Sequence, residues 1–299
     1  MDCSHRHQWQ DNDCRTHSRN ASQRRISRSC LRQCSTTVIE TVDSLEKHDY
    51  LVLELSSFQL HWLEDAQFVS SSILNIAQDH VDWHGSFDAY AKAKLSILDK
   101  SMTAILNAED GEIVTRTTHW QGRKVFFSLD TPAPGEIGVV EELLVDRAFV
   151  ADPQEAAMFC ELIEVTPTVP HNVSNTLAAA GLARTVGTPH EAIRTAIREF
   201  TPGRHRIEKV CEKDGITWIN DSKATNPHAA SASIMSALSV IWVAGGLAKG
   251  AAMDELVARI KSRVRVAILI GEDRELIAKE LSENAPHIEL IRVDAPADY

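Results

Sequence analysis

Two strand-like apolar runs each end in polar side chains, and this repeated pattern constrains the fold more than any other feature of the chain. The first run, Tyr50–Leu53, is followed by Glu54, and the second, Val69–Ile76, by Asp79 and His80. Short continuous apolar runs of this kind are typical of strands buried in a parallel sheet. Ligands of open α/β sheets bind beyond the carboxyl ends of the strands, so the pattern predicts a binding site there.

Glu54 and His80 are the side chains at these strand ends that predict a metal site. Oxygen ligands suit a hard cation such as Mg2+, which usually keeps phosphate oxygens as further ligands. Each residue also has a plainer interpretation. An acidic residue at a strand end can cap the next helix, and a lone histidine is more often structural.

Apolar strand-like runs alternate with helical runs, and this alternation predicts a parallel sheet covered by helices. Besides the two runs above, strands are predicted at Thr103–Leu106 and Val125–Phe127, and helices at Phe87–Leu98, Val173–Val186 and Pro189–Glu199. Thr188 is a predicted N-cap for the last of these helices. The less regular segment Leu143–Pro170 is expected to add an antiparallel edge to the sheet.

Thr201-Pro202-Gly203 predicts a domain junction, after which the alternation restarts. The predicted strands are Ile216–Ile219, Ser239–Ala244, Val264–Ile270 and Glu289–Val293, and the predicted helices are Met253–Lys261 and Asp273–Ser282. The chain is therefore expected to contain one α/β domain at residues 37–202 and a second at residues 203–299.

Composition excludes several classes of protein. The 299 residues carry a net charge of −11 and are 43% hydrophobic, which is typical of a folded protein of about two domains. No apolar run approaches the ~18 residues that span a bilayer, and the acidic charge argues against non-specific binding of nucleic acid. Only Cys160 and Cys211 follow residue 36, which favours a reducing cytoplasm. A cytoplasmic monomer without a membrane or nucleic-acid partner is expected.

Residues 1–36 differ in character from the rest of the chain, because they contain no lysine, no glycine and no helical or strand period. Their composition alone indicates a basic disordered segment, and a basic arm that binds nucleic acid is a second interpretation. A third follows from a shift of one nucleotide in the reading frame. Permitted codons for Met1–Thr16 then encode TGTNGKTTT, a Gly-rich loop of the kind that binds phosphate. We expect residues 1–36 to be an out-of-frame translation.

Several segments, in order, resemble the Mur ligases of peptidoglycan synthesis. They are ELSSFQL with NIAQDHVDWHG after it, HNVSN, FTPGRHRIE and NDSKATN, which lie between residues 54 and 226. The sequences ELSSFQL and, later, GGLAKG are most similar to those of the family member that adds D-glutamate. The resemblance implies a UDP-binding domain, a central ATPase domain and a Rossmann-like C-terminal domain. Here it implies a central domain without its phosphate loop at residues 37–202, a truncated C-terminal domain at residues 203–299, and no UDP-binding domain.

The resemblance also implies roles for individual residues. It implies Mg2+ ligands at Glu54, His80 and Lys94, with Lys94 carbamylated by CO2, and a catalytic set of Lys94, His80 and Lys223. It implies ATP contacts at Asn172, Asn175, Arg206 and Asp221, and substrate contacts at Ser56, Thr225 and Lys249. Plainer interpretations stay open: Lys94 as a surface lysine like Lys92, the asparagines as helix caps, and the glycines around Lys249 as a tight turn. The roles of Ser57 and Gln59 are also open.

The implied reaction joins D-glutamate to UDP-N-acetylmuramoyl-L-alanine through an acyl phosphate, with ATP and Mg2+. Another Mur ligase or a folylpolyglutamate synthetase is the alternative within this superfamily. An inactive fragment is the alternative outside it. Because it has no in-frame phosphate loop, the chain as written is expected to be inactive.

Overall fold

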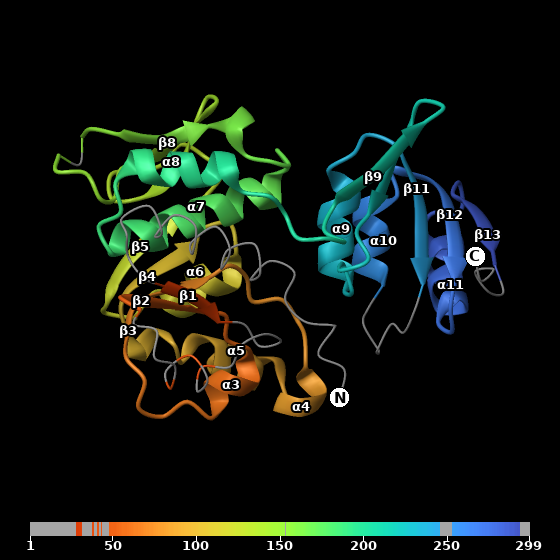
Figure 1. Ribbon diagram of the computed structural model, residues 1–299. Helices are drawn as coiled ribbons and strands as arrows, with labels where there is room; N and C mark the ends of the chain where they lie inside the picture. Colours follow the sequence, from red (N-terminus) through yellow and green to blue (C-terminus); the bar gives the residue numbers. More distant parts are fainter. Residues whose placement is uncertain are drawn as a thin grey trace. The chain divides into compact units, whose positions relative to one another are not determined.

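The computed structural model describes residues 28–31, 38, 41, 43, 48–152, 154–245 and 253–293. The chain divides into two compact units, Met1–Pro202 and Gly203–Tyr299, and each is described by itself (Figure 1). Both units are mixed α/β structures, so the predicted fold class is confirmed.

A six-stranded sheet with the strand order β3-β4-β5-β6-β7-β8 forms the centre of the first unit. Its strands are β3 (Phe68–Ile73), β4 (Ser101–Asn107), β5 (Arg123–Phe127), β6 (Ile137–Val140), β7 (Leu143–Asp146) and β8 (Ala157–Glu161). Neighbours from β3 to β6 pair in parallel, whereas β6, β7 and β8 pair antiparallel. The antiparallel edge predicted between Leu143 and Pro170 is therefore present.

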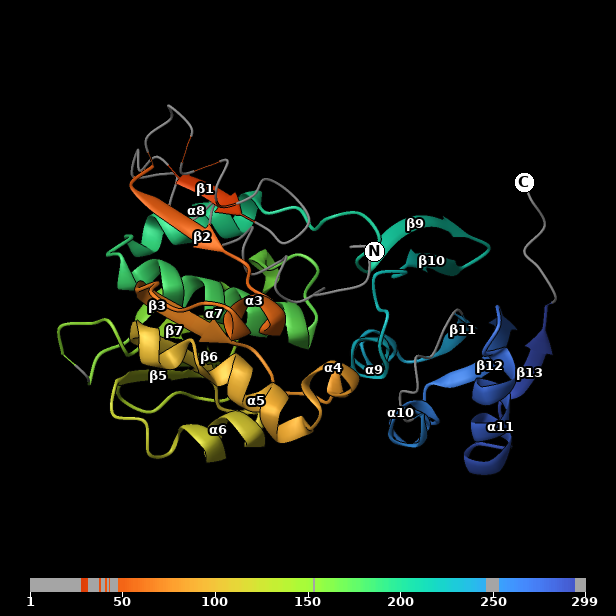
Figure 2. The same cartoon turned by 90° about the horizontal axis from the view of Figure 1, so that it is seen from below.

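Helices cover both faces of this sheet (Figure 2). The helices are α3 (Ser57–His61), α4 (Val81–His84), α5 (Phe87–Leu95), α6 (Gly111–Thr117), α7 (Pro170–Thr185) and α8 (His190–Glu199), with 3-10 turns η2 (Leu98–Lys100) and η3 (Leu162–Glu164). Apolar side chains of α5 and α6 pack on one face of the sheet, and those of α7 and α8 pack on the other. The sheet is thus buried on both sides, as its continuous apolar strands predict.

Helix α7 packs closely on the sheet because its middle consists of small residues. Ala178, Ala179, Ala180 and Ala183 are fully buried. At Gly181, an added Cβ would lie 2.9 Å from Cγ2 of Ile105 on β4, so a larger residue would force the helix and strand apart. The Ala-rich sequence that indicated a helix thus also sets how closely this helix approaches the sheet.

Two strands near the start of the described chain form a separate parallel ribbon. Strand β1 (Arg28–Leu31) pairs with β2 (Tyr50–Leu53), and the two make a two-stranded sheet of their own. The composition of residues 1–36 indicates a disordered segment, whereas Arg28–Leu31 form a strand through backbone pairing with β2. The rest of that segment lies outside the described residues.

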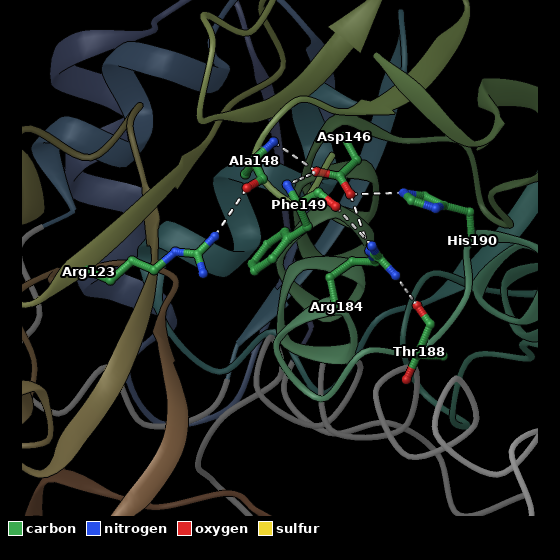
Figure 3. A network of polar contacts seen from close by, with 7 residues as sticks. All are labelled: Arg123, Asp146, Ala148, Phe149, Arg184, Thr188 and His190. Carbon is green, nitrogen blue, oxygen red and sulfur yellow. Dashed lines mark hydrogen bonds and ion pairs between the residues drawn. The ribbon is translucent and has the colours of Figure 1, made fainter. Parts of the chain in front are cut away.

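A buried carboxylate connects four segments on the α7 face of the sheet (Figure 3). Asp146, at the end of β7, is fully buried and accepts hydrogen bonds from the amides of Ala148 and Phe149 at 2.9 and 2.8 Å. Its Oδ2 lies 2.8 Å from Nε2 of His190 and 3.3 Å from Nε of Arg184. Because His190 and Arg184 belong to α8 and α7, this network fixes both helices to the end of β7.

The second unit contains a three-stranded parallel sheet and an antiparallel ribbon. Its elements are β9 (Glu208–Lys213), β10 (Ile216–Asn220), α9 (Pro227–Met235), β11 (Val240–Gly245), α10 (Asp254–Ile260), β12 (Val264–Ile270), α11 (Arg274–Asn284) and β13 (Glu289–Arg292). The sheet has the order β11-β12-β13, and its core forms against α9, α10 and α11. No helix in the described part of either unit is long and apolar enough to cross a membrane.

The predicted strand Ile216–Ile219 is present as β10, which pairs antiparallel with β9. The turn between them, Asp214-Gly215, has positive φ at both residues, a conformation that favours tight hairpins. Thr188 is not the N-cap of α8, because Pro189 occupies that position and the helix begins at His190.

Candidate functional site

Three consecutive residues beyond β3 are each fixed by a side chain from another element. The carbonyl of Leu74 accepts a hydrogen bond from Nδ2 of Asn107 at 2.9 Å, and the carbonyl of Asn75 accepts one from Nζ of Lys94 at 2.6 Å. The amide of Ile76 donates to Oδ2 of Asp110 at 2.9 Å. The backbone that leads to His80 is therefore held by the end of β4, the start of α6 and helix α5.

Lys94 and Lys92 lie on the same helix but differ in how far their side chains are exposed to solvent. Lys92 is exposed, whereas Lys94 is partly buried on the same helix and reaches the loop after β3. Desolvation lowers the pKa of Lys94 to about 8, although the nearby carboxylates of Asp110 and Asp79 act in the opposite direction. A minor fraction of Lys94 is therefore neutral near neutral pH, more than for an exposed lysine, and the neutral amine is the form that reacts with CO2.

His80 lies at the start of α4 in a strained backbone conformation. Its φ of 52° is in the left-handed region, which is uncommon for a residue with a side chain. Its amide donates to Oδ1 of Asp79 at 2.9 Å, and its ring lies 4.9 Å from the ring of Phe58 on α3. Because Phe58 follows β2 and His80 follows β3, this contact shows that the two strand-end loops meet.

Glu54 and Ser56 occupy the loop between β2 and α3, and both are buried. Ser56 is the N-cap of α3: its Oγ accepts from the amide of Gln59 at 3.3 Å, while Oε1 of Gln59 accepts from the Ser56 amide at 2.9 Å. This reciprocal capping box gives Ser56 and Gln59 a structural role. The predicted contact of Ser56 with substrate stays a prediction. Glu54 does not cap α3, because Ser56 is its N-cap. The alternative interpretation of Glu54 as a helix cap is therefore wrong.

The first turns of α7 lie at the same edge of the sheet as these loops. Oγ1 of Thr185 is 2.8 Å from Oγ of Ser70 on β3, whereas Gly181 packs on Ile105, which pairs with Ser72 further along β3. Helix α7 therefore runs antiparallel to β3 and β4. Its N-terminus, with the partial positive charge of its free N–H groups, lies towards the carboxyl ends of those strands.

Asn172 and Asn175 lie in these first turns and are both buried. Neither is the N-cap, which is Val169. Nδ2 of Asn172 donates to the carbonyl of Pro167 at 2.9 Å, so its amide has a structural contact. In contrast, Nδ2 of Asn175 is buried without a hydrogen-bond partner among the residues that the structure describes. A buried donor without a partner costs free energy, and a ligand at this point would satisfy it.

In the second unit, the GRHRIE part of the FTPGRHRIE segment lies against the NDSKATN segment. The amide of Ile207 donates to Oδ1 of Asp221 at 3.1 Å, and the amide of Lys223 donates to the carbonyl of His205 at 3.2 Å. Arg206 is buried, and desolvation lowers its pKa to about 10 despite the opposing charge of Asp221. These contacts bring Arg206, Asp221 and Lys223 to one place within this unit.

The backbone of this loop is strained where it carries the arginine. His205 and Ile207, on either side of Arg206, have positive φ values of 66° and 46°. Such a conformation is rare for a β-branched residue and is held only where the surroundings enforce it, often at ligand sites. Thr225 is exposed beyond Lys223. Lys249 lies outside the described residues, so its predicted contact with substrate has no structural account.

The predicted metal ligands are few but chemically suitable. No group of three or more His, Cys, Asp and Glu side chains is arranged to hold a metal within the described ranges. Glu54 supplies a buried carboxylate and His80 an imidazole on adjoining loops, and a carbamylated Lys94 would add a second anionic oxygen group. Mg2+ commonly uses one or two protein carboxylates and completes its shell with water and phosphate, so this set fits it.

Sequence reasoning missed the side chains that position this site. Asp110 and Asn107 hold the loop after β3, and Tyr90 lies beside Lys94, whose Nζ is 5.6 Å from the Tyr90 ring centre. Asn107 and Asp110 follow the predicted strand Thr103–Leu106, so the same strand-end pattern that singled out Glu54 and His80 also marks them. Tyr90 has no comparable signal, because an aromatic residue one turn before a lysine is common on helices.

Comparison with known families agrees with this arrangement. The family described as "Mur ligase middle domain" matches residues 31–183, and the one described as "Mur ligase, glutamate ligase domain" matches residues 205–297. The chain belongs to the Mur ligase family. The predicted resemblance is thereby confirmed over most of the sequence.

Relatives of this Mur ligase chain include enzymes named UDP-N-acetylmuramoylalanine--D-glutamate ligase. That of Streptomyces avermitilis is 46% identical over 264 residues, which cover 86% of this chain and 56% of the relative. That of Thermobifida fusca is 47% identical over 264 residues, which cover 86% of this chain and 57% of the relative. The chain thus spans just over half the length of these enzymes.

Solved structures with the same fold are more distant in sequence. MurF from Acinetobacter baumannii superimposes with a TM-score of 0.69 at 17% identity, over 94% of this chain and 65% of that one. A pseudomurein peptide ligase type C from Methanothermus fervidus gives a TM-score of 0.70 at 13% identity, over 95% of this chain and 65% of that one. At these identities the comparison shows the Mur ligase fold alone.

Proposed function

We propose that this Mur ligase chain is part of an enzyme that uses ATP to join D-glutamate to UDP-N-acetylmuramoyl-L-alanine in peptidoglycan synthesis. The observation that carries the proposal is the identity of 46% to an enzyme of that name, over 86% of the chain. The aligned region is long enough to include the motifs around Glu54, His80, Lys94 and Asn175, and it supports the D-glutamate reaction over that of another ligase.

In this reaction the γ-phosphoryl group of ATP passes to the alanyl carboxylate of the acceptor. The amine of D-glutamate then attacks the acyl phosphate carbon, the C–N bond forms, and inorganic phosphate leaves. Such phosphoryl transfer depends on positioning and on stabilising spread negative charge. The residues therefore need to orient substrates and supply positive charge rather than form covalent bonds.

Each unit would supply a part of these requirements. In the first, Glu54 and His80 would hold Mg2+, which neutralises phosphate charge when bound, and Asn175 would donate its buried amide N–H to the nucleotide. In the second, Arg206 would contact phosphate, Asp221 a ribose hydroxyl, and Lys223 the transferred phosphoryl group or the incoming amino acid. The contacts between their two loops support a common role for these residues.

Carbamylation of Lys94 is the part of the proposal that depends most on its surroundings. Partial burial and a pKa of about 8 make the neutral amine available, and its attack on CO2, with release of one amine proton to solvent, would form an anionic carbamate. The plainer role is that of an unmodified lysine, whose Nζ donates a hydrogen bond to the carbonyl of Asn75. The two roles differ in charge and can be told apart by experiment.

We further propose that the domain limits are residues 37–202 and 203–299 and that the enzyme is a cytoplasmic monomer. The division of the chain between Pro202 and Gly203 supports the boundary. Another Mur ligase or a folylpolyglutamate synthetase is less well supported, because the relatives at 40–47% identity bear the D-glutamate ligase name.

The deciding experiment compares the 299-residue chain with a restored protein. In the restored protein, the peptide encoded by the adjacent frame replaces residues 1–36, and the flanking coding sequence extends it to the length of its relatives. With UDP-N-acetylmuramoyl-L-alanine and Mg-ATP, the restored protein should release phosphate only when D-glutamate is added. L-lysine, meso-diaminopimelate and L-glutamate serve as alternative acceptors. A preference for one of these would overturn the proposed substrate, and a stop codon in the adjacent frame would leave only an inactive fragment.

A further inference from the structure

The single-turn helix α4 (Val81–His84) carries a side chain that the proposed function has not used. His84 lies at the end of this helix, and its Nε2 is 3.0 Å from Oγ of Ser57 on α3. This hydrogen bond connects the loop that follows β3, which carries His80, with the loop that follows β2, which carries Glu54. The two candidate metal ligands therefore lie on loops joined through His84.

The rings around His84 extend this connection to a third element. The His84 ring is stacked on Phe58 of α3, with centres 5.6 Å apart and an interplanar angle of 16°. The His84 ring also meets the Tyr90 ring of α5 edge to face, with centres 5.5 Å apart. Tyr90 in turn lies 5.6 Å from Nζ of Lys94. A continuous series of contacts thus runs from the β2 loop through His84 to the candidate ligand Lys94.

Helix α4 needs such contacts because it has little stability of its own. It has four residues, and its N-cap His80 makes no side-chain capping bond. The residues on either side of it, His80 and Gly85, both have left-handed backbones with φ of 52° and 81°. Isolated helices this short do not form in water. The conformation that places His80 must therefore be maintained by side chains that hold α4 against α3 and α5.

We propose that His84 is a positioning residue that holds the loops bearing Glu54 and His80 together, and against the helix bearing Lys94, in the geometry that binds a divalent cation. The inference rests on the proposed function for the identity of the metal ligands. It assigns His84 no contact with the metal or the substrate. Its role is comparable to that of hydrogen-bonded groups behind metal ligands, whose loss typically weakens metal binding 10- to 100-fold.

The test uses Mn2+ binding to the 299-residue chain, measured by electron paramagnetic resonance in bicarbonate buffer. His84→Phe keeps an aromatic ring but removes the hydrogen bond, and Ser57→Ala removes its partner. Each should weaken Mn2+ affinity by about 10-fold. The double variant should be no weaker than either single variant, because both remove the same bond. His84→Gln, whose amide nitrogen can approach Oγ of Ser57, should restore most of the affinity.

His61→Ala is the matched control. The His61 ring on α3 also contacts α4, at 5.2 Å from Trp83, but it forms no hydrogen bond with α4 in the part of the chain that the structure describes. This change should leave Mn2+ affinity nearly unchanged, because it removes a ring contact but no hydrogen bond between the loops that carry Glu54 and His80. A general loss of packing would affect both histidine variants, whereas a positioning role affects only His84.

A second readout does not depend on the metal. Amide hydrogen exchange of the metal-free chain should become faster in residues 79–85 and 55–60 together in His84→Phe and in Ser57→Ala, but not in His61→Ala. If exchange rises but Mn2+ affinity does not fall, His84 is only a packing residue and the inference is overturned. If Glu54→Ala binds Mn2+ as tightly as the unmodified chain, the proposed metal site itself is wrong, and the inference fails with it.

Discussion

Nζ of Lys94 donates a hydrogen bond to the carbonyl oxygen of Asn75 at 2.6 Å, so helix α5 is bound to the loop that follows strand β3. This contact places the lysine at the carboxyl end of the sheet, within the influence of Asp79 and Asp110. The state of Lys94 is therefore coupled to the conformation of the segment that carries His80.

Replacing Lys94 with alanine in the restored protein should remove most of the D-glutamate-dependent phosphate release, whereas Lys92→Ala should change it little, because Lys92 is exposed. If the lost group is a carbamate, a small carboxylate such as acetate or formate should restore part of the rate. Near-normal turnover of Lys94→Ala, or a larger loss in Lys92→Ala, would show that Lys94 is a structural lysine.

The carbamate should also depend on pH in a defined direction. Burial lowers the Lys94 pKa from its usual 10.5 to about 8, so the neutral amine increases as the pH rises through 8. At fixed bicarbonate concentration, 13C NMR of the labelled protein should show a carbamate signal that grows between pH 7 and 8.5. Lys94→Ala should lack this signal. A signal that persists in Lys94→Ala would assign the carbamate to another amine.

Asp146→Asn should destabilise the first unit by about 3 kcal/mol, because it leaves Arg184 without its buried charged partner. Burial opposes ionisation of Asp146, but hydrogen bonds from His190, Phe149 and Ala148 outweigh it and hold its pKa below the usual value of 3.8. Because the folded pKa is depressed, the stabilisation is present above about pH 4 and is lost as the pH falls through the folded pKa.

Urea unfolding read from hydrogen exchange of β7 and α8 peptides would measure this loss. Asp88→Asn is the control, because the Asp88 side chain is 75% exposed in its ion pair with Arg116, and such surface pairs contribute less than about 1 kcal/mol. Equal effects of the two changes would mean that the network in Figure 3 does not stabilise the unit more than a surface ion pair does.

Gly181→Ala should destabilise the first unit by about 1–3 kcal/mol, although alanine is the better helix former, because the new Cβ would lie 2.9 Å from Cγ2 of Ile105 in a closely packed core. Gly111→Ala tests the opposite case. Gly111 begins α6, and an added Cβ there meets nothing within 4 Å. It should be neutral or stabilising by up to about 1 kcal/mol. Circular dichroism melting of both variants would compare them.

The parts of this chain that sequence predicts well are those in which one local pattern decides the structure. The runs that became β3, β4, β5 and β12 appear within a few residues of their predicted bounds, because short, mainly apolar runs are typical of strands buried in a parallel sheet. The contrast between Lys92 and Lys94 was likewise predictable from helical spacing. In each case the signal lies within one turn or one strand.

The parts that were missed depend on contacts between distant segments. Strand β1 exists through its pairing with β2, and neither run alone indicates the other. The hydrogen bond between His84 and Ser57 joins positions that are 27 residues apart. Neither residue alone carries a sequence signal that predicts this contact. The antiparallel β10 was predicted as a strand but not in its pairing, because its residues fit either kind of sheet. The candidate site residues lie in recognisable motifs, whereas contacts such as the one between His84 and Ser57 are visible only in the structure.

Asn175→Ala should weaken binding of a non-hydrolysable ATP analogue to the restored protein by about 10-fold, because one hydrogen bond to a charged ligand contributes roughly 1.5–3 kcal/mol. It should cost little stability, since Nδ2 of Asn175 is a buried donor that no described protein group accepts from. Asn172→Ala should show the reverse balance, because its amide already donates to Pro167 at 2.9 Å and the fold loses that bond. Isothermal titration calorimetry and thermal melting of both variants would separate the two effects. If Asn175→Ala bound the analogue normally but melted much earlier, its amide would serve the helix rather than the nucleotide, and the predicted ATP contact would be wrong at that position.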